Sequence, residues 1–287
     1  MKLITLIEHE AARLEQSGVS FGHGTTNAFD EAVWLALWRL GLPLEDLDGA
    51  AERVLGADEQ AAIVALVDQR ITSRRPAAYL TAEAWLQGVP FHVDERVIIP
   101  RSLIAEHLAD GDLDALLGRE PQTVLDLCTG NGSLAVLCAM AWPSARIDAA
   151  DLSAEALAVA ALNRQRHGLE QRIELMQGDG LQAVGSRRYD LIVCNPPYVN
   201  TQSMAALPAE YRAEPALALD GGRDGMDFVR PLLAQVAPHL TDEGWLVLEI
   251  GHERGHFESA FPELQPLWLL NSAGGDQVLA LSARDLQ

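Results

Sequence analysis

The first 75 residues carry a helical pattern of apolar and polar positions. Apolar side chains recur three and four positions apart over residues 3–14, 30–40 and 58–73, with charged side chains between them. The run Gly41-Leu42-Pro43 ends the second of these stretches. The pattern therefore predicts a small helical domain over residues 1–75.

The pattern changes over residues 76–100. Pro76 ends the helical part, and two short runs of β character, at 84–86 and 91–93, flank a turn at Gly88-Val89-Pro90. We predict that a β-hairpin links the helical domain to a second domain. A helix is then expected to begin at Ser102, because a serine hydroxyl suits the N-cap position.

Strand-like and helix-like patterns alternate in the rest of the chain. Buried strands are predicted at 123–127, 145–150, 172–176, 189–194 and 244–250, with helices at 133–141 and 153–167. This alternation is typical of a parallel sheet that helices cover on both faces. Apolar runs at 267–270 and 277–281 around a Gly-Gly pair predict a terminal antiparallel hairpin. The fold class is therefore α/β, with a second domain over residues 101–287.

Charge and cysteine content narrow the function classes. The 287 residues include 41 acidic and 21 basic side chains, a net charge of −20. This net charge disfavours nucleic acid as a partner and favours a basic protein. The alternative explanation is that the charge serves only to keep the protein soluble. The cysteines Cys128, Cys138 and Cys194 form no metal-binding pair, so we expect no metal site and free thiols in the cytoplasm. We expect neither a signal peptide nor a membrane span.

A glycine-containing loop lies where the first strand of the second domain meets its helix. It reads Asp126-Leu127-Cys128-Thr129-Gly130-Asn131-Gly132, and its two glycines let the backbone approach a ligand closely. Asp151 ends the next strand, where a carboxylate can bind both ribose hydroxyls of a nucleoside. A nicotinamide dinucleotide also fits the spacing Gly130-x-Gly132-x-x-Ala135.

Asp126 favours S-adenosylmethionine over a dinucleotide. A carboxylate just before the glycines would repel a pyrophosphate, whereas it suits ammonium and sulfonium charges. Asp179, between Gly178 and Gly180, either reaches the adenine amino group or merely forms a turn. The predicted cofactor site, which would release S-adenosylhomocysteine, comprises Asp126, Cys128, Thr129, Gly130, Asn131, Gly132, Asp151, Asp179, Gly180 and Asn195.

The run Asn195-Pro196-Pro197-Tyr198 follows a buried strand at once. Its prolines make a stiff loop that holds the Asn195 side chain at the carboxyl edge of the sheet. If a substrate amide donates its N–H groups to the Asn195 side chain and the Pro196 carbonyl, its nitrogen is aimed at an activated methyl group. We predict Asn195, Pro196 and Tyr198 as catalytic, and all four residues, Pro197 included, as the substrate site. A rigid turn that merely ends a strand is the alternative.

These motifs resemble the amino methyltransferases with an Asn-Pro-Pro-Tyr loop, and the whole chain resembles the bacterial protein-(glutamine-N5) methyltransferases. Residues 76–80 and 99–101 match the linker of that family, and residues 214–225 match the segment after its catalytic loop. The resemblance implies a Rossmann-like, seven-stranded class I methyltransferase domain over 101–287. It further implies a helical substrate-recognition domain over 1–75, a β-hairpin linker over 76–100, and N5-methylation of a glutamine amide.

Two subfamilies compete, one methylating the Gly-Gly-Gln glutamine of peptide-chain release factors and the other a glutamine of the large-subunit ribosomal protein uL3. Residues 22–32, 93–102 and 126–130 resemble the uL3 enzymes, and Cys128 stands where the release-factor enzymes usually carry Gly. We therefore expect uL3 as the protein partner, with the release-factor glutamine as the alternative.

More distant alternatives are DNA adenine methylation, which the acidic helical domain disfavours, and a ribosome assembly factor without turnover. The sequence leaves open the oligomeric state, the docking surface and the roles of Arg101 and Glu106.

Overall fold

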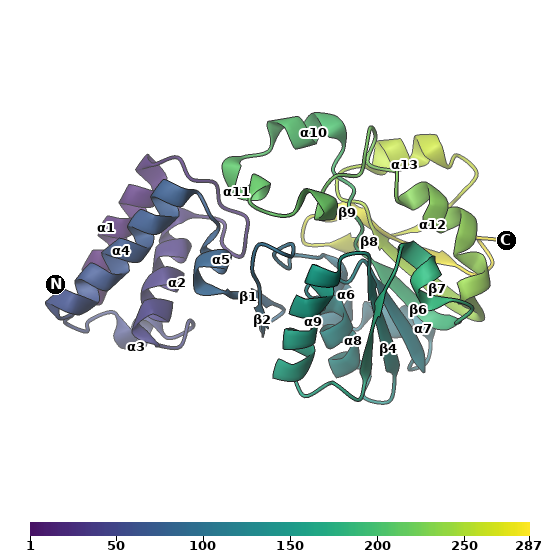
Figure 1. Ribbon diagram of the computed structural model, residues 1–287, viewed down its shortest axis with the longest axis horizontal. Coiled ribbons are helices and arrows are strands. Elements are labelled where there is room, and N and C mark those ends of the chain that lie inside the picture. Colours follow the sequence, from purple (N-terminus) through teal and green to yellow (C-terminus); the bar gives the residue numbers. More distant parts are fainter. The chain divides into compact units, whose positions relative to one another are not determined.

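The computed structural model describes residues 1–287 and divides into two compact units (Figure 1). The helical unit comprises Met1–Ala84 and Leu207–Ala213, and the sheet unit comprises Trp85–Ala206 and Glu214–Gln287. The chain thus passes from one unit to the other at 84/85, 206/207 and 213/214. Sequence analysis placed the first boundaries at 75/76 and 100/101 and did not foresee the return of residues 207–213 to the helical unit.

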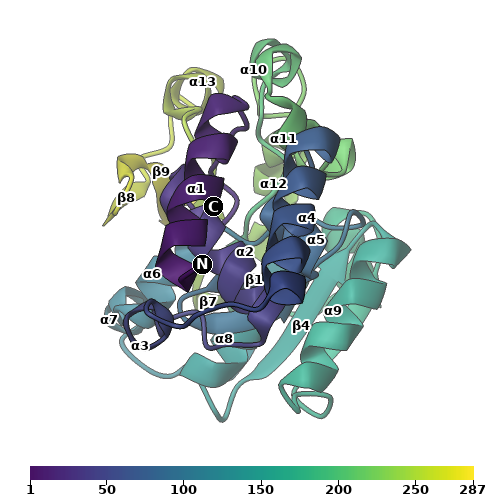
Figure 2. The ribbon, with the colours of Figure 1, turned by 90° about the vertical axis from the view of Figure 1, so that its left-hand side faces the viewer.

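The helical unit is built on three amphipathic helices that pack against one another, α1 (Leu3–Gln16), α2 (Ala28–Leu40) and α4 (Ala57–Ser73) (Figure 2). Their apolar faces are fully buried at Leu3, Ile7, Leu14, Leu35 and Ile63. The Asn27 side chain caps α2 by accepting a hydrogen bond from the Asp30 N–H at 2.9 Å. Shorter helices complete the unit: α3 (Leu47–Ala50), α5 (Ala77–Thr81) and α11 (Ala209–Arg212).

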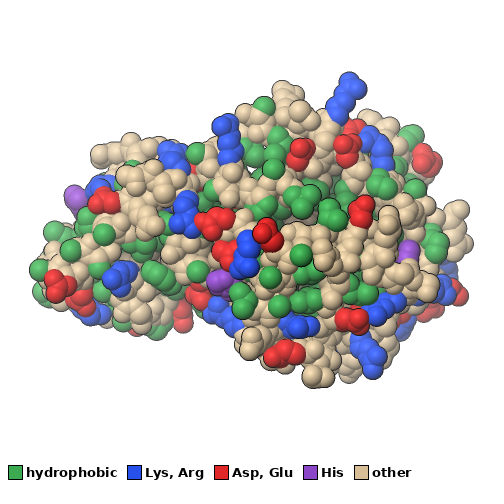
Figure 3. Space-filling view, viewed as in Figure 1, with side chains coloured by type: hydrophobic (Ala, Val, Ile, Leu, Met, Phe, Trp, Pro, Cys, Tyr) green, Lys and Arg blue, Asp and Glu red, His purple; other side chains and the backbone are tan.

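The surface bears both signs of charge. On the face drawn in Figure 3, Lys and Arg side chains are scattered among Asp and Glu side chains and do not gather into one basic patch. None of the helices combines the length and the apolar character that crossing a membrane requires.

The predicted hairpin consists of β1 (Glu83–Leu86) and β2 (Val89–His92), where the chain enters the sheet unit. Its turn lies at Gln87-Gly88, and both residues have positive φ angles, as the tight turns of two-residue hairpins require. The turn is therefore one residue shorter than the Gly88-Val89-Pro90 turn that the sequence predicted, because Val89 and Pro90 already belong to β2.

The sheet unit contains a seven-stranded sheet in the order β5-β4-β3-β6-β7-β9-β8. Its strands are β3 (Thr123–Leu127), β4 (Arg146–Asp151), β5 (Ile173–Gln177), β6 (Tyr189–Cys194), β7 (Leu240–Glu249), β8 (Leu267–Asn271) and β9 (Gly274–Ser282). The first five are parallel, and β9 runs antiparallel to both β7 and β8. This confirms the predicted α/β class, the parallel sheet and the terminal hairpin.

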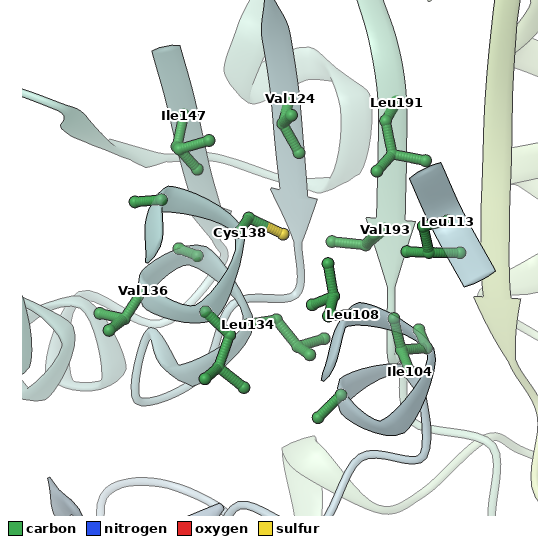
Figure 4. Packing of buried hydrophobic residues seen from close by; sticks show 14 of the residues in the cluster. Ile104, Leu108, Leu113, Val124, Leu134, Val136, Cys138, Ile147, Leu191 and Val193 are labelled. Atoms are coloured by element: carbon green, nitrogen blue, oxygen red, sulfur yellow. The ribbon is translucent and has the colours of Figure 1, made fainter. Parts of the chain in front are cut away.

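Helices cover both faces of this sheet. Figure 4 shows one face, where Val124, Ile147, Leu191 and Val193 of the strands meet apolar side chains of α6 (Ile104–Ala109), α7 (Asp112–Leu117) and α8 (Ser133–Ala141). Strand side chains alternate between faces, so their neighbours Leu125 and Ile192 pack on the opposite face. There they meet η1 (Gly180–Val184), α12 (Val229–Gln235) and α13 (Arg254–Ala260). The remaining elements are α9 (Ala154–Arg166), α10 (Thr201–Ala206), η2 (Ala216–Ala218) and η3 (Ala237–His239).

Candidate active site

One pocket lies where β3, β4 and β6 end, at the carboxyl edge of the sheet. Strand register brings these ends together, because Leu127 of β3 pairs with Ala150 of β4 and with Cys194 of β6. The pocket encloses about 800 Å³, part of which is open to solvent. All of its lining residues belong to the sheet unit.

Asp126 holds the glycine loop after β3 in place through hydrogen bonds. Asp126 Oδ2 accepts hydrogen bonds from the Thr129 hydroxyl at 2.5 Å and from the Ala135 N–H at 2.9 Å. Its other carboxylate oxygen is buried without a hydrogen-bond partner, and burial raises the pKa of Asp126 from 3.8 to about 7. Asp126 does not line the pocket and helps to shape the loop through these hydrogen bonds, and its direct pairing with a cofactor cation stays a prediction.

Gly132 shows why this loop needs glycine. Its φ angle is +81°, and a Cβ atom there would lie 3.1 Å from the Cβ of Ala160 on α9. The helix α8 therefore begins directly against α9, with its first residue, Ser133, next to the loop.

Asp151 joins the loop to the end of β4. One carboxylate oxygen accepts the Gly130 N–H and the other accepts the Ser153 N–H, each at 2.9 Å. Burial raises the pKa of Asp151 above its ordinary value. Unlike Asp126, Asp151 lines the pocket, and each oxygen keeps a lone pair for a ligand hydroxyl.

The Asn195–Tyr198 loop is held on several sides. The Tyr198 hydroxyl donates to Glu249 Oε1 at 3.1 Å. The pKa of Tyr198 is raised well above its ordinary value, chiefly by burial and next by the charge of Glu249. A Cβ atom on Gly221 would lie 2.7 Å from the Tyr198 Cα, and one on Gly225 would clash with the Tyr198 carbonyl oxygen. The segment 214–225 is therefore packed directly against the backbone of the loop.

Two buried carboxylates brace the surroundings of the loop. Glu249 Oε2 accepts the Ser102 hydroxyl at 2.6 Å and the Leu103 N–H at 2.9 Å. Glu214 receives both guanidinium nitrogens of Arg101, at 2.6 and 2.7 Å, and the Ile99 N–H at 2.9 Å. Arg101 thus braces the Ile99-Pro100-Arg101 segment against Glu214. Glu106 makes a similar brace, accepting the Ser272 N–H and hydroxyl.

The predicted site residues divide into two groups. Those that line the pocket are Cys128, Gly130, Asp151, Asp179, Gly180, Asn195 and Pro197. Those that lie outside its walls are Asp126, Thr129, Asn131, Gly132, Pro196 and Tyr198. The second group lies in the same loops as the first, and within it the Thr129 hydroxyl donates to Asp126 and the Tyr198 hydroxyl donates to Glu249.

Sequence reasoning missed part of the wall. The missed residues are Arg96, Val97, Ile98, Leu127, Ala150, Leu152, Ser153, Ala156, Gly178, Pro215, Leu217, Ala218 and Phe228. Arg96, Val97 and Ile98 belong to the segment 93–102, and Pro215, Leu217 and Ala218 belong to the segment 214–225. The sequence indicated both segments only through their resemblance to known enzymes. Phe228 carried no signal, since an isolated aromatic residue beyond a Gly-rich stretch is ordinary core.

Comparisons with known proteins agree with this architecture. Residues 103–214 match the methyltransferase small domain family. The chain is 52% identical to the ribosomal protein uL3 glutamine methyltransferase of Bordetella pertussis, over 98% of this chain and 95% of that protein. The chain belongs to the ribosomal protein uL3 glutamine methyltransferase family. Family members so named from Burkholderia pseudomallei and Neisseria gonorrhoeae are 49% and 44% identical, over 98% of this chain and 94% and 93% of their own lengths.

A solved structure independently shows the same fold. The hMettl16 catalytic domain, in complex with the MAT2A 3′UTR hairpin 6, superposes with a TM-score of 0.53 at 14% identity. The match covers 79% of the chain described here and 81% of the hMettl16 chain. The predicted class I methyltransferase fold is confirmed, and this family implies S-adenosylmethionine as the methyl donor.

Proposed function

We propose that this protein transfers a methyl group from S-adenosylmethionine to the N5 amide nitrogen of a glutamine in ribosomal protein uL3. The observation that carries the proposal is that one pocket contains both Asp151, which suits a ribose, and Asn195 with Pro197, which suit a planar amide. Full-length relatives that are 44–52% identical bear the name of this activity.

The groups that line the pocket suit S-adenosylmethionine in their chemistry. Asp151 offers carboxylate oxygens for the ribose hydroxyls, and Leu152, Ile98 and Phe228 offer apolar surface for the adenine. Asp179 stands beside them as an acceptor for the adenine amino group. When bound, S-adenosylmethionine supplies an electrophilic methyl group.

The chain's own contribution to the reaction is positioning. An amide nitrogen is a weak nucleophile, since its lone pair is delocalised into the carbonyl group. Acceptance of its two N–H groups by the Asn195 side-chain oxygen and the Pro196 carbonyl would aim the nitrogen and stabilise the positive charge that develops on it. The nitrogen gains a methyl group and releases one proton to water. The braces on Tyr198 keep these acceptors in place before the substrate arrives.

The choice of uL3 over release factors rests on the relatives and on charge. The relatives with near-full-length similarity are named for uL3, and a protein of net charge −20 attracts a basic ribosomal protein. DNA is disfavoured by the same net charge, and the face drawn in Figure 3 shows no single basic patch.

The test uses purified full-length protein, labelled S-adenosylmethionine, and purified uL3 or release factor. We expect label on one uL3 glutamine amide, located by mass mapping, and none on the Gly-Gly-Gln peptide. Asn195→Ala should lower kcat at least about 100-fold while the protein stays folded. Asp151→Asn should raise the Kd of S-adenosylmethionine about 10- to 100-fold, and the exposed control Asp242→Asn should change neither quantity. Label on the release factor alone would reject the proposed target.

A further inference from the structure

Helix α9 runs beside three elements that adjoin the segments lining the pocket. It packs against α8, β4 and the hairpin strand β2, all of which belong to the sheet unit (Figure 1). Four residues, Ala156, Ala160, Asn163 and His167, follow one another along it at spacings of four, three and four positions. Side chains at this spacing lie on one face of a helix, so these four form a single stripe.

The first two residues of the stripe, Ala156 and Ala160, are small and lie at the pocket and at the glycine loop. Ala156 lines the pocket directly. Ala160 lies so near Gly132 that a Cβ atom on that glycine would be 3.1 Å from the Ala160 Cβ. The glycine loop therefore rests against α9 with no room for a side chain between them.

The next residue of the stripe, Asn163, is fully buried, and both ends of its amide group are engaged. Its Oδ1 accepts the His92 N–H at 2.7 Å. Its Nδ2 donates one hydrogen bond to the His92 carbonyl at 2.9 Å and another to the Asn131 carbonyl at 2.8 Å. His167 adds a further link to β2, since its Nε2 lies 2.9 Å from the Pro90 carbonyl oxygen. Asn163 thus joins the backbones of two segments that lie 71 and 32 positions away in the sequence.

His92 is the point from which one pocket wall starts. Arg96, Val97 and Ile98 line the pocket, and Asp94 fixes the turn that leads to them. The Asp94 carboxylate accepts the Arg96 N–H at 3.1 Å and the Arg96 Nη2 at 2.6 Å, and the Asp94 carbonyl accepts the Val97 N–H at 3.1 Å. Because this turn is held by its own hydrogen bonds, a shift of His92 is passed on to Val97 and Ile98.

Asn131 belongs to the adjoining wall, the glycine loop. It stands between Gly130, which lines the pocket, and Gly132. The two walls meet, since a Cβ atom on Gly130 would lie 3.7 Å from Ile98 Cγ2. Asn163 does not line the pocket, yet it is bonded to the backbone of the glycine loop and to the residue from which the other wall starts. It therefore fixes how the two walls stand relative to each other.

We propose that Asn163 is a positioning residue for S-adenosylmethionine. By joining the Asn131 carbonyl to both backbone groups of His92, it holds the glycine loop and the 96–98 wall in the arrangement that the cofactor needs before the cofactor arrives. The position requires an amide, because one planar group must supply one acceptor and two donors. A carboxylate offers no donor, and an apolar side chain offers neither. This inference rests on the proposed function for the identity of the cofactor.

A matched pair of variants on α9 separates positioning from simple stability. Asn163→Leu keeps the size of the side chain but leaves three buried backbone groups without their partner. Val159→Ala removes apolar volume from an equally buried residue that does not line the pocket. By calorimetry, Asn163→Leu should raise the Kd of S-adenosylmethionine at least about tenfold, and Val159→Ala should leave it within about twofold of wild type. In Asn163→Leu, kcat at saturating cofactor should stay within about threefold, because the Asn195–Tyr198 loop has its own braces.

A second variant, Asn163→Ser, leaves room for water to reach the same backbone groups and serves if Asn163→Leu does not fold. It should raise the Kd of S-adenosylmethionine at least about fivefold. Hydrogen exchange of the ligand-free protein should be faster over residues 92–98 and 128–132, relative to the rest of the sheet unit, in the Asn163 variants and not in Val159→Ala.

The outcomes of these measurements are distinct. A Kd of S-adenosylmethionine that is the same in the Asn163 variants as in Val159→Ala would overturn the inference, as would a fall in kcat with an unchanged Kd. If the wild-type protein binds no S-adenosylmethionine, the proposed function fails. Faster exchange at 92–98 and 128–132 in the Asn163 variants alone would then still support Asn163 as the link between the two walls.

Discussion

Replacement of Asp126 by asparagine should make the protein more stable at high pH while changing its stability little at pH 5. The Asp126 side chain is 1% exposed, and only one of its two oxygens has hydrogen-bond partners. A carboxamide can keep both hydrogen bonds through its oxygen, and it carries no charge. The variant Asp126→Asn thus imitates the protonated acid at every pH.

The magnitude follows from the pKa of about 7 against the ordinary 3.8. A carboxyl whose pKa is higher in the folded state binds its proton more tightly there, so the wild type loses stability as pH rises from 3.8 through 7. At 1.36 kcal/mol per pKa unit, the loss between pH 5 and pH 8 is about 3 kcal/mol. The amide NH₂ group, buried where an oxygen lacks a partner, costs about 1–3 kcal/mol at every pH. Because the wild type has already lost about 1.7 kcal/mol at pH 5, the variant should lie within about 1 kcal/mol of wild type at pH 5 and be more stable by about 1–3 kcal/mol at pH 8.

Urea unfolding of both proteins without ligand, at pH 5 and pH 8, measures this difference. The other carboxyls with raised pKa values, such as Asp151 and Glu249, are present in both proteins and cancel in the comparison. A difference in unfolding free energy that is the same at both pH values would refute the reasoning. It would mean that Asp126 stays charged in the fold, held by groups other than Thr129 and Ala135.

Two further predictions concern the brace on the catalytic loop. If Glu249 acts on the reaction through the Tyr198 hydroxyl, Tyr198→Phe and Glu249→Gln should each lower kcat. The kcat of the double variant should then be no lower than that of the worse single variant. Fully additive losses of kcat in this double-mutant cycle would disprove the coupling. Gly225→Ala, whose Cβ would clash with the Tyr198 carbonyl, should lower kcat about tenfold or more and destabilise the fold by over about 2 kcal/mol. Gly118→Ala, at a similar positive φ with open space around it, should cost only about 1 kcal/mol and leave kcat unchanged, as calorimetric unfolding and steady-state assays would show.

The order of strands and helices could be predicted because each has a clear period. Residues 123–127 and 189–194 are apolar runs of strand length that lie buried in the middle of a sheet, and the pattern alone identifies them. The insertion of 207–213 into the helical unit could not be predicted in this way. Its anchor is Glu210, a charged residue in a short polar stretch, and such a residue normally indicates solvent exposure. Its burial depends on Arg70 and Arg74, more than 130 positions away in the sequence.

The site was predictable where a residue's role follows from its position at a strand end. Asp151 and Asn195 end or follow parallel strands, and both line the pocket. Asp126 shows the limit of this reasoning. Its position before the glycines predicts an acidic residue near a cation, but no spacing reveals that one of its oxygens accepts hydrogen bonds from Thr129 and Ala135. Val97 and Ile98 show the same limit, since an apolar linker predicts core as readily as a ligand wall.

The catalytic loop takes its geometry from contacts within the sheet unit. Asn195–Tyr198 is fixed by prolines, by Glu249 and by close-packed glycines, so its geometry does not depend on which protein is bound. A rigid loop can serve any planar amino group, because methyl transfer from an activated donor needs alignment more than a particular partner. The choice of one glutamine must then come from residues outside the loop, whose side chains can differ without disturbing the acceptors that we propose on Asn195 and Pro196.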